Sequence, residues 1–175
     1  MTEMLLYTVF QTDWGHFGLA GTTRGLVCSH LPARDSETVR MNPAGHSAQA
    51  EFSAGLFKPL QEQIKAYFQG ISTNFNTHID LLLDGFKPFE KAVLRACRTI
   101  KFGQKVTYKQ LATIADYPCA ARAAANVMAK NPLPLIVPCH RVIKSNGQIG
   151  GFSATTDAAT KAKLLELEHI YPTRV

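Results

Sequence analysis

The sequence of 175 residues predicts an α+β fold in two parts, a small antiparallel sheet with a helix followed by a mainly helical domain. Three observations predict this class. Alternating apolar and polar residues fill much of the first third of the chain. Apolar residues recur at helical spacing from about residue 53 to 69 and again after residue 88. The stretch DGFKP at 84–88 carries turn and breaker residues. We therefore expect an N-terminal α/β domain at 1–84 and a second domain at 85–175.

In the N-terminal part, the sequence pattern predicts two or more strands ahead of a helix. Leu5, Tyr7 and Val9 alternate with shorter or polar residues, which is typical of a half-buried strand. The stretch HFGLAGTTRGLVCSHL at 16–31 predicts a hairpin that turns between Gly21 and Gly25. A further strand is expected at 79–83.

One helix is expected from about Ser53 to Gln69, with Gly70 closing it as a C-cap. Its apolar residues recur at helical spacing, namely Leu56, Leu60, Ile64, Tyr67 and Phe68.

The second part predicts short helices. One ends near Ile100 and has an apolar face made by Phe89, Val93, Leu94 and Cys97. Thr107 can cap a second helix in which Leu111 and Ile114 face inward. The residues YPCA at 117–120 break that helix, and ARAAANVMAK at 121–130 begins another.

These two short helices around a tight turn fit two interpretations, a DNA-binding helix-turn-helix and an αα-hairpin in a core. Asn131 precedes Pro132 and ends the second of them, because a residue before proline disfavours helical geometry. The apolar LPLIV at 133–137 then reads as a buried strand.

Composition and charge narrow the functional classes. The formal charge of +6 and the isoelectric point of about 9.3 permit binding to a phosphate-rich partner without establishing it. Glu3 stands where a signal peptide needs positive charge, and no segment has the length required to span a membrane. We therefore expect a cytoplasmic protein.

The four cysteines, Cys28, Cys97, Cys119 and Cys139, are widely scattered, which favours reduced thiols over a disulfide scaffold. Three of them are expected only to fill space. Cys28 lies near His30 and Cys139 is next to His140, so each pair places two possible zinc ligands close together. Structural zinc sites usually contain paired ligands such as Cys-x-x-Cys, which this sequence lacks. No metal site is expected.

The pair Cys139 and His140 suggests nucleophilic chemistry. A buried thiol is inert unless a base or a positive field favours the thiolate, which His140 and Arg141 could provide. Sequence neighbours do not face one another on a helical turn, so a bridging water is the more natural link. The histidine would need a carboxylate to hold its tautomer, and Glu166 and Glu168 are both candidates. The alternative is a structural cysteine beside a surface histidine.

The stretch NPLPLIVPCHRVI at 131–143 resembles the active-site signature of the O6-alkylguanine-DNA alkyltransferases, also called methylated-DNA-protein-cysteine methyltransferases. The similarity runs from Pro88 to His169. It includes PFEKAVLRACRTIKFGQKVTYKQLA, AARAAANVMAKNP and the loop IGGFS. The N-terminal half matches only in its pattern of strands and helix. The resemblance implies a ribonuclease H-like N-terminal domain and a C-terminal domain with a helix-turn-helix.

The resemblance also implies catalytic roles. Cys139 would accept the alkyl group irreversibly, His140 would be a water-mediated base, and Glu168 would polarise that histidine. Asn131 would be the hinge that fixes the strand to the recognition helix. Tyr108 would aid rotation of the target nucleotide and donate a proton to the departing guanine.

Other residues would contact DNA or the flipped base. Arg122 would enter the base stack where the target has left, after flipping through the minor groove. The resemblance places the base pocket at Met128, Val142, Phe152 and Ser153, and backbone contacts at Lys109 and Ser145. It implies double-stranded DNA carrying O6-alkylguanine as the partner of a monomer, with no cofactor. Cooperative binding along DNA and repair of O4-alkylthymine stay open.

Two departures from the family affect the predicted binding surfaces. Ala125 and Asn126 stand where relatives often carry glycines in the recognition helix. The pocket loop, usually Tyr-Ser-Gly-Gly, reads FSAT at 152–155. Two alternative functions also remain. A cysteine hydrolase would need an oxyanion hole that the sequence does not display. A non-catalytic module that recognises alkylated bases would lack the cysteine.

Overall fold

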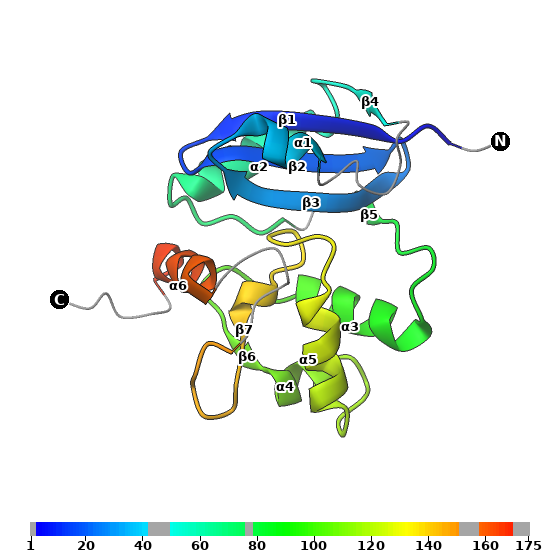
Figure 1. Ribbon diagram of the computed structural model, residues 1–175. Coiled ribbons are helices and arrows are strands. Elements are labelled where there is room, and N and C mark those ends of the chain that lie inside the picture. Colours follow the sequence, from blue (N-terminus) through cyan, green and yellow to red (C-terminus); the bar gives the residue numbers. More distant parts are fainter. Residues whose placement is uncertain (1–2, 42–49, 76–78, 151–157, 170–175) are drawn as a thin grey trace. The chain divides into compact units, whose positions relative to one another are not determined.

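The computed structural model describes residues 3–41, 50–75, 79–150 and 158–169, and the chain divides into two compact units, Met1–Asp84 and Gly85–Val175. Figure 1 shows a sheet with helices in the first unit and mainly helices in the second. The predicted α+β class is confirmed. None of the helices within these ranges is long and apolar enough to cross a bilayer.

The sheet of the first unit has the order β4-β1-β2-β3-β5. Its long central strands, β1 (Leu6–Thr12), β2 (Gly15–Thr22) and β3 (Gly25–Ala33), are antiparallel neighbours. The expected hairpin is therefore confirmed, with Thr22 paired to Gly25 at its turn. The edges are the short parallel strands β4 (Glu51–Phe52) and β5 (Asp80–Leu81), and β5 is shorter than the strand expected at 79–83.

Helix α2 (Lys58–Phe68) begins later than the sequence predicts. Phe57 before it adopts a left-handed backbone with φ of 51°, which breaks the helical path. Gly70, with φ of 81°, follows its end, as expected from the C-cap. The ring of Phe68 lies 6.1 Å from that of Phe17, so the apolar face of α2 packs against β2.

Helix α1 (Ser36–Met41) was not predicted. Asp35 caps it, because its carboxylate accepts hydrogen bonds from the backbone amides of Glu37 and Thr38 at 3.0 and 3.2 Å. The helix is only six residues long, too short for a clear apolar period.

The second unit contains α3 (Pro88–Arg98), α4 (Tyr108–Ile114), α5 (Ala121–Ala129) and α6 (Ala158–Leu167). Thr107 caps α4 as predicted, since its hydroxyl accepts the amide of Gln110 at 3.2 Å. Ile114 was expected to face inward, but it is 49% exposed. The buried residues of α4 are Leu111 and Ala112, and Ala115, one turn after Leu111, is also buried just past the helix end, whereas Ile114 lies outside this face.

The segment at 133–137 does not form the strand that was expected. Prolines at 132, 134 and 138 have no backbone N–H to donate to a ladder. Leu135 has φ of 76°, which reverses the chain, and the amide of Val137 donates back to the carbonyl of Leu133 at 2.8 Å. The result is a tight buried loop. It leads into a 3-10 helix, η1 (Cys139–Arg141).

Two short strands place the start of α4 close to η1. β6 (Val106–Thr107) pairs in parallel with β7 (Val142–Ile143), with Val106 opposite Val142. Because α4 begins directly after β6 and η1 ends directly before β7, this pairing brings Tyr108 into the neighbourhood of Cys139.

Candidate active site

Cys139 is the first residue of η1 and is only 2% exposed. Its sulfur accepts a hydrogen bond from Nδ2 of Asn131 at 3.1 Å. The same amide group donates to the carbonyl of Val137 at 2.8 Å, and its Oδ1 accepts the amide of Leu133 at 3.0 Å. Asn131 therefore fastens a loop, rather than the expected strand, to the end of α5. The same side chain contacts the thiol.

His140 and Arg141 follow Cys139 in η1, and both side chains contact Glu168. His140 Nε2 is 2.7 Å from Oε1 of Glu168, and Arg141 Nη2 donates to the same oxygen at 2.9 Å. Arg141 Nε also reaches Oε2 at 3.0 Å, and the amide of Gly103 donates to Oε2 at 3.1 Å. All three side chains are buried. Such a densely bonded carboxylate can hold an imidazole in one orientation.

The structure distinguishes the two candidate carboxylates. Glu166 is exposed on α6. Glu168 follows the last residue of that helix, is 2% exposed and faces η1. The chain after α6 therefore brings Glu168 to His140, and Cys139 precedes that histidine in η1.

Glu168 strongly favours its ionised form over its protonated form. Burial alone would raise its pKa, but the hydrogen bonds and positive charges of His140 and Arg141 lower the pKa to about 2. Burial lowers the pKa of His140, although the hydrogen bond to Glu168 and the charge of that carboxylate act to raise it. At neutral pH the arrangement is a neutral imidazole held by a carboxylate, which is able to receive a proton.

The thiol itself is not ionised at rest. Burial raises the pKa of Cys139 above its usual value. The hydrogen bond from Asn131 opposes that shift, as do the charge of Lys161 and the backbone amides of Cys139 and His140. The thiol is therefore protonated at rest, but Asn131, Lys161 and the nearby backbone amides would stabilise its thiolate.

Lys161 was missed by the sequence analysis. It is fully buried on α6, and Nζ donates to the carbonyl of Val142 at 2.6 Å. Nζ also lies 5.8 Å from the ring centroid of Tyr108, and burial lowers the lysine pKa to about 8. A signal was present, because Lys161, Leu164, Leu165 and Glu168 follow the spacing of one helical face.

Tyr108 is half-buried at the start of α4. Burial raises the pKa of its phenol, so the proton stays on the oxygen at neutral pH. Gly150 packs against it, since a Cβ at that position would lie 3.3 Å from the phenol oxygen. Gly150 also has φ of 77°, which L-residues with side chains rarely adopt. The sequence analysis did not single out this glycine.

The residues expected to line the base pocket are only partly described. Met128 is buried on α5 and Val142 is buried at the start of β7. Phe152 and Ser153 lie outside the described residues.

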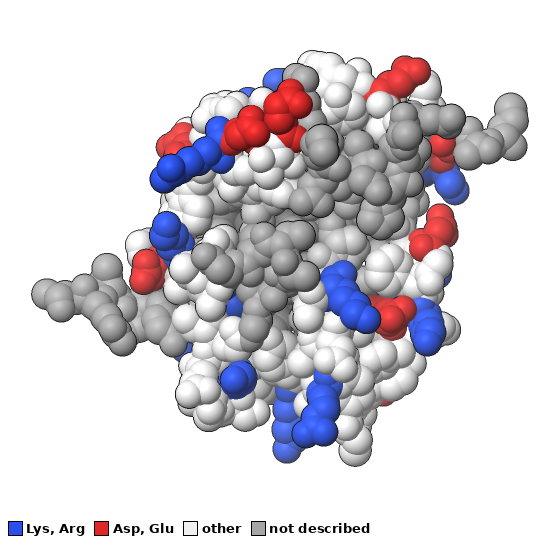
Figure 2. Space-filling model, viewed as in Figure 1, with Lys and Arg blue, Asp and Glu red and all other residues white. Residues whose placement is uncertain are grey.

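The residues expected to contact DNA lie on the surface of the second unit. Arg122 on α5, Lys109 on α4 and Ser145 are all exposed. Residues 85–175 contain 14 Lys and Arg and five Asp and Glu, a net charge of +9, whereas residues 1–84 have a net charge of −3. Figure 2 shows basic side chains gathered where Figure 1 places α4 and α5. The basic surplus therefore belongs to the helical unit.

The other thiols differ in exposure. Cys97 is buried and Cys28 is partly buried, with a pKa raised by burial to about 11. Cys119 is exposed, so the expectation that it only fills space is wrong. It lies in the turn between α4 and α5, where no core covers it. Within the described ranges, no group of three or more His, Cys, Asp or Glu side chains is arranged to hold a metal ion.

Known proteins resemble this chain over nearly all of its length. The family model for the DNA-binding domain of 6-O-methylguanine DNA methyltransferase matches residues 88–170. The methylated-DNA–protein-cysteine methyltransferase of Cricetulus griseus is 34% identical over 184 residues, covering 99% of this chain and 86% of the relative. The protein of the same name from Sulfolobus acidocaldarius is 32% identical, and the match covers 95% of each chain.

Solved structures agree with these sequence matches. The crystal structure of Mycobacterium tuberculosis O6-methylguanine methyltransferase has a TM-score of 0.74 at 30% identity, covering 98% of this chain and 97% of that one. A crystal structure described as Mycobacterium tuberculosis OGT in complex with DNA has a TM-score of 0.75 at 30% identity, covering 93% and 92% of the two chains.

Proposed function

Because this chain belongs to the O6-methylguanine-DNA methyltransferase family, we propose that it repairs DNA by transferring an alkyl group from O6-alkylguanine to Cys139. One observation carries the assignment to Cys139. Its buried sulfur accepts a hydrogen bond from Asn131 and belongs to the same short helix as His140, which is bonded to Glu168. The DNA-binding and acceptor functions both belong to residues 85–175 in this proposal.

Activation of the thiol requires movement of one proton. The neutral His140 takes the proton of Cys139 through a bridging water, and Glu168 stabilises the imidazolium that forms. Asn131 and Lys161 then stabilise the thiolate, which burial alone would disfavour. In this way a thiol that is unreactive at rest becomes nucleophilic when the substrate is in place.

The transfer itself is a displacement at the alkyl carbon. The sulfur of Cys139 forms a bond to that carbon while the bond between the carbon and O6 of guanine breaks. The electron pair stays with the guanine, which takes a proton from the phenol of Tyr108, and the proton that His140 received from the thiol then restores the phenol through water. Normal guanine and S-alkylcysteine are the products.

Access to the buried sulfur requires extrusion of the damaged nucleotide. A sulfur cannot approach an O6-alkyl group in line within a base stack, and flipping costs a few kcal/mol. α5 docks in the minor groove of duplex DNA, and Arg122 occupies the space that the base leaves. The net charge of +9 on residues 85–175 supports this docking.

Arg122→Ala is expected to slow alkyl transfer in duplex DNA by about 10- to 100-fold, because a few kcal/mol of flipping cost would no longer be offset. Single-stranded DNA should be affected far less, since its bases are already accessible. Single-turnover rates on both substrates measure this difference. Arg95→Ala removes an exposed arginine from α3 and serves as the control. Equal slowing on both substrates would show that Arg122 does not act on the base stack.

The stoichiometry of repair tests the proposed function. With excess duplex DNA containing O6-methylguanine, we expect repair to stop at one equivalent per active protein. The thioether has no adjacent carbonyl for water to attack, and no step in the proposal regenerates the thiol. Peptide mass spectrometry should find the methyl group on Cys139. Repair that continues past one equivalent, with free thiol returning, would instead identify a cysteine hydrolase.

A further inference from the structure

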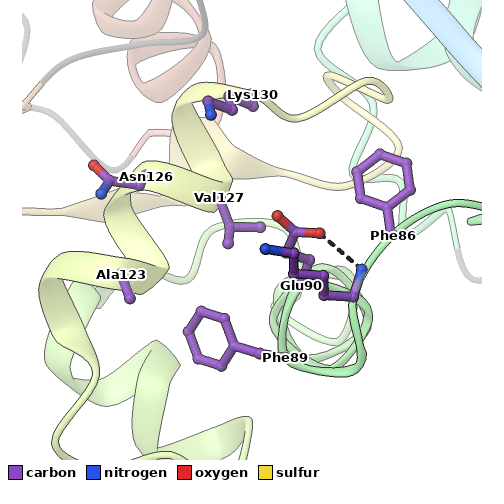
Figure 3. A pocket seen from close by; sticks show the side chains of 8 residues that line it. Phe86, Phe89, Glu90, Ala123, Asn126, Val127 and Lys130 are labelled. Carbon is purple, nitrogen blue, oxygen red and sulfur yellow. Dashed lines mark hydrogen bonds between the residues drawn. The ribbon is translucent and has the colours of Figure 1, made fainter.

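A pocket lies on the flank of α5, formed with the first turn of α3 (Figure 3). Its volume is about 270 Å³. Apolar side chains form much of its lining, and two lysines contribute positive charge to it. These residues are Phe86, Phe89, Ala123, Val127, Lys87 and Lys130. None of them has a role in the alkyl transfer proposed above.

The apolar part of the pocket offers an aromatic surface held in place. Phe89 and Tyr117 contact edge to face, with ring centroids 4.9 Å apart and an interplanar angle of 90°. Figure 3 shows the Phe89 ring between α3 and α5, with Val127 and Ala123 pointing toward the space beside it. Phe86 also lines the pocket, and in this view it lies on the opposite side of Glu90 from Phe89. Such rings offer apolar faces on which a flat aromatic group can stack.

The polar part of the pocket favours the binding of an anion. Lys87 and Lys130 are exposed and carry positive charge. The acidic side chain in the lining, Glu90, accepts a hydrogen bond from the backbone amide of Lys87 at 2.8 Å. Its charge is thereby directed to the start of α3, where the helix dipole stabilises it. The pocket thus combines an aromatic surface with net positive charge.

The position of the pocket on α5 relates it to DNA. Ala123 follows Arg122 directly, and Asn126, which also lines the pocket, lies one helical turn beyond Arg122. Arg122, Ala123 and Asn126 are all exposed. A nucleic-acid strand that follows α5 beyond Arg122 would pass the pocket.

We propose that this pocket binds an unpaired nucleotide, with the base against Phe86 and Phe89 and a phosphate at Lys87 and Lys130. The inference rests on the proposed function, because docking of DNA on α5 brings a strand to the pocket. The same chemistry is present in a free nucleotide. The site differs from the one that receives the alkylated guanine, since Cys139 does not line it.

The test compares two undamaged duplexes of equal sequence, one blunt and one with a two-nucleotide 3′ overhang. Fluorescence anisotropy with the full-length protein gives both dissociation constants. We expect about tenfold tighter binding of the overhang duplex, since stacking of one base on an aromatic side chain is worth about 1–3 kcal/mol. Addition of deoxycytidine monophosphate tests the free nucleotide. Loss of the overhang preference would show that free nucleotides also enter the pocket, and persistence would restrict it to DNA strands.

Two variants test whether any preference arises at the pocket. Ala123→Met fills the space, and Lys87→Gln with Lys130→Gln removes both positive charges. Each variant should bind the blunt and the overhang duplex with equal dissociation constants. Lys163→Gln removes an exposed lysine from α6 outside the pocket and should preserve the ratio. Equal affinity of the wild-type protein for both duplexes would overturn the proposal. A ratio that both variants leave intact would overturn it as well.

Methylation of Cys139 by damaged duplex separates the two proposals. If wild-type protein becomes methylated yet shows no overhang preference, only the nucleotide pocket is wrong. If Cys139 is never methylated, the proposed function fails first.

Discussion

Replacement of Cys139 by alanine is expected to abolish alkyl transfer completely while leaving the affinity for duplex DNA nearly unchanged. The sulfur is the only atom that the proposed reaction bonds to the alkyl group. It is also buried, at 2% exposure, so it adds little to the surface that meets DNA. Loss of one small buried atom should cost stability on the order of 1 kcal/mol, which leaves the protein folded. Methyl transfer from labelled DNA and duplex affinity are measured side by side.

Cys119→Ala is the matched control for this experiment. It removes an exposed thiol from the same unit, in the turn between α4 and α5. This variant should become methylated on Cys139 at the wild-type rate. Residual transfer in Cys139→Ala would mean that another side chain is the nucleophile.

Glu168→Gln is expected to lower both stability and activity. The pKa of Glu168 is lowered to about 2 from the usual 4.5, so the ionised carboxylate in its folded surroundings favours the folded state by a net free energy on the order of a few kcal/mol. Because the folded-state pKa is depressed, this stability is present above about pH 5 and is lost as the pH falls toward 2. Urea denaturation at several pH values should show that loss in the wild-type protein. Glu168→Gln should be less stable at pH 7 and lack this part of the pH dependence.

The same substitution should slow alkylation of Cys139 by on the order of 100-fold and move the rate profile to higher pH. A neutral amide cannot stabilise the imidazolium that forms when His140 takes the thiol proton. Glu166→Gln is the control, because it removes an exposed carboxylate two positions earlier in the chain. A wild-type pH profile in Glu168→Gln would remove Glu168 from the relay and leave it only a role in stability.

Local patterns in the sequence predicted much of the second unit. The cap at Thr107, the break at 117–120 and the helix carrying Arg122 depend on residues close to one another in the chain. Local chemistry therefore decides them. The sequence did not predict the late start of α2, because the left-handed backbone of Phe57 has no signal in the apolar spacing. It did not predict α1 either, because that helix is short and is marked only by the cap at Asp35.

By itself, the sequence determined the α+β class, the basic character of the chain and the family resemblance carried by residues 131–143. It also grouped Cys139 and His140 with a carboxylate; residue chemistry left Glu166 and Glu168 both open, and the family resemblance favoured Glu168. Tertiary structure gives the physical reason, because the packing of the chain end after α6 buries Glu168 against His140 and Arg141. It also placed Lys161 beside Tyr108 and turned 133–137 into a loop. These features depend on contacts between residues far apart in the chain, whose geometry no local pattern encodes.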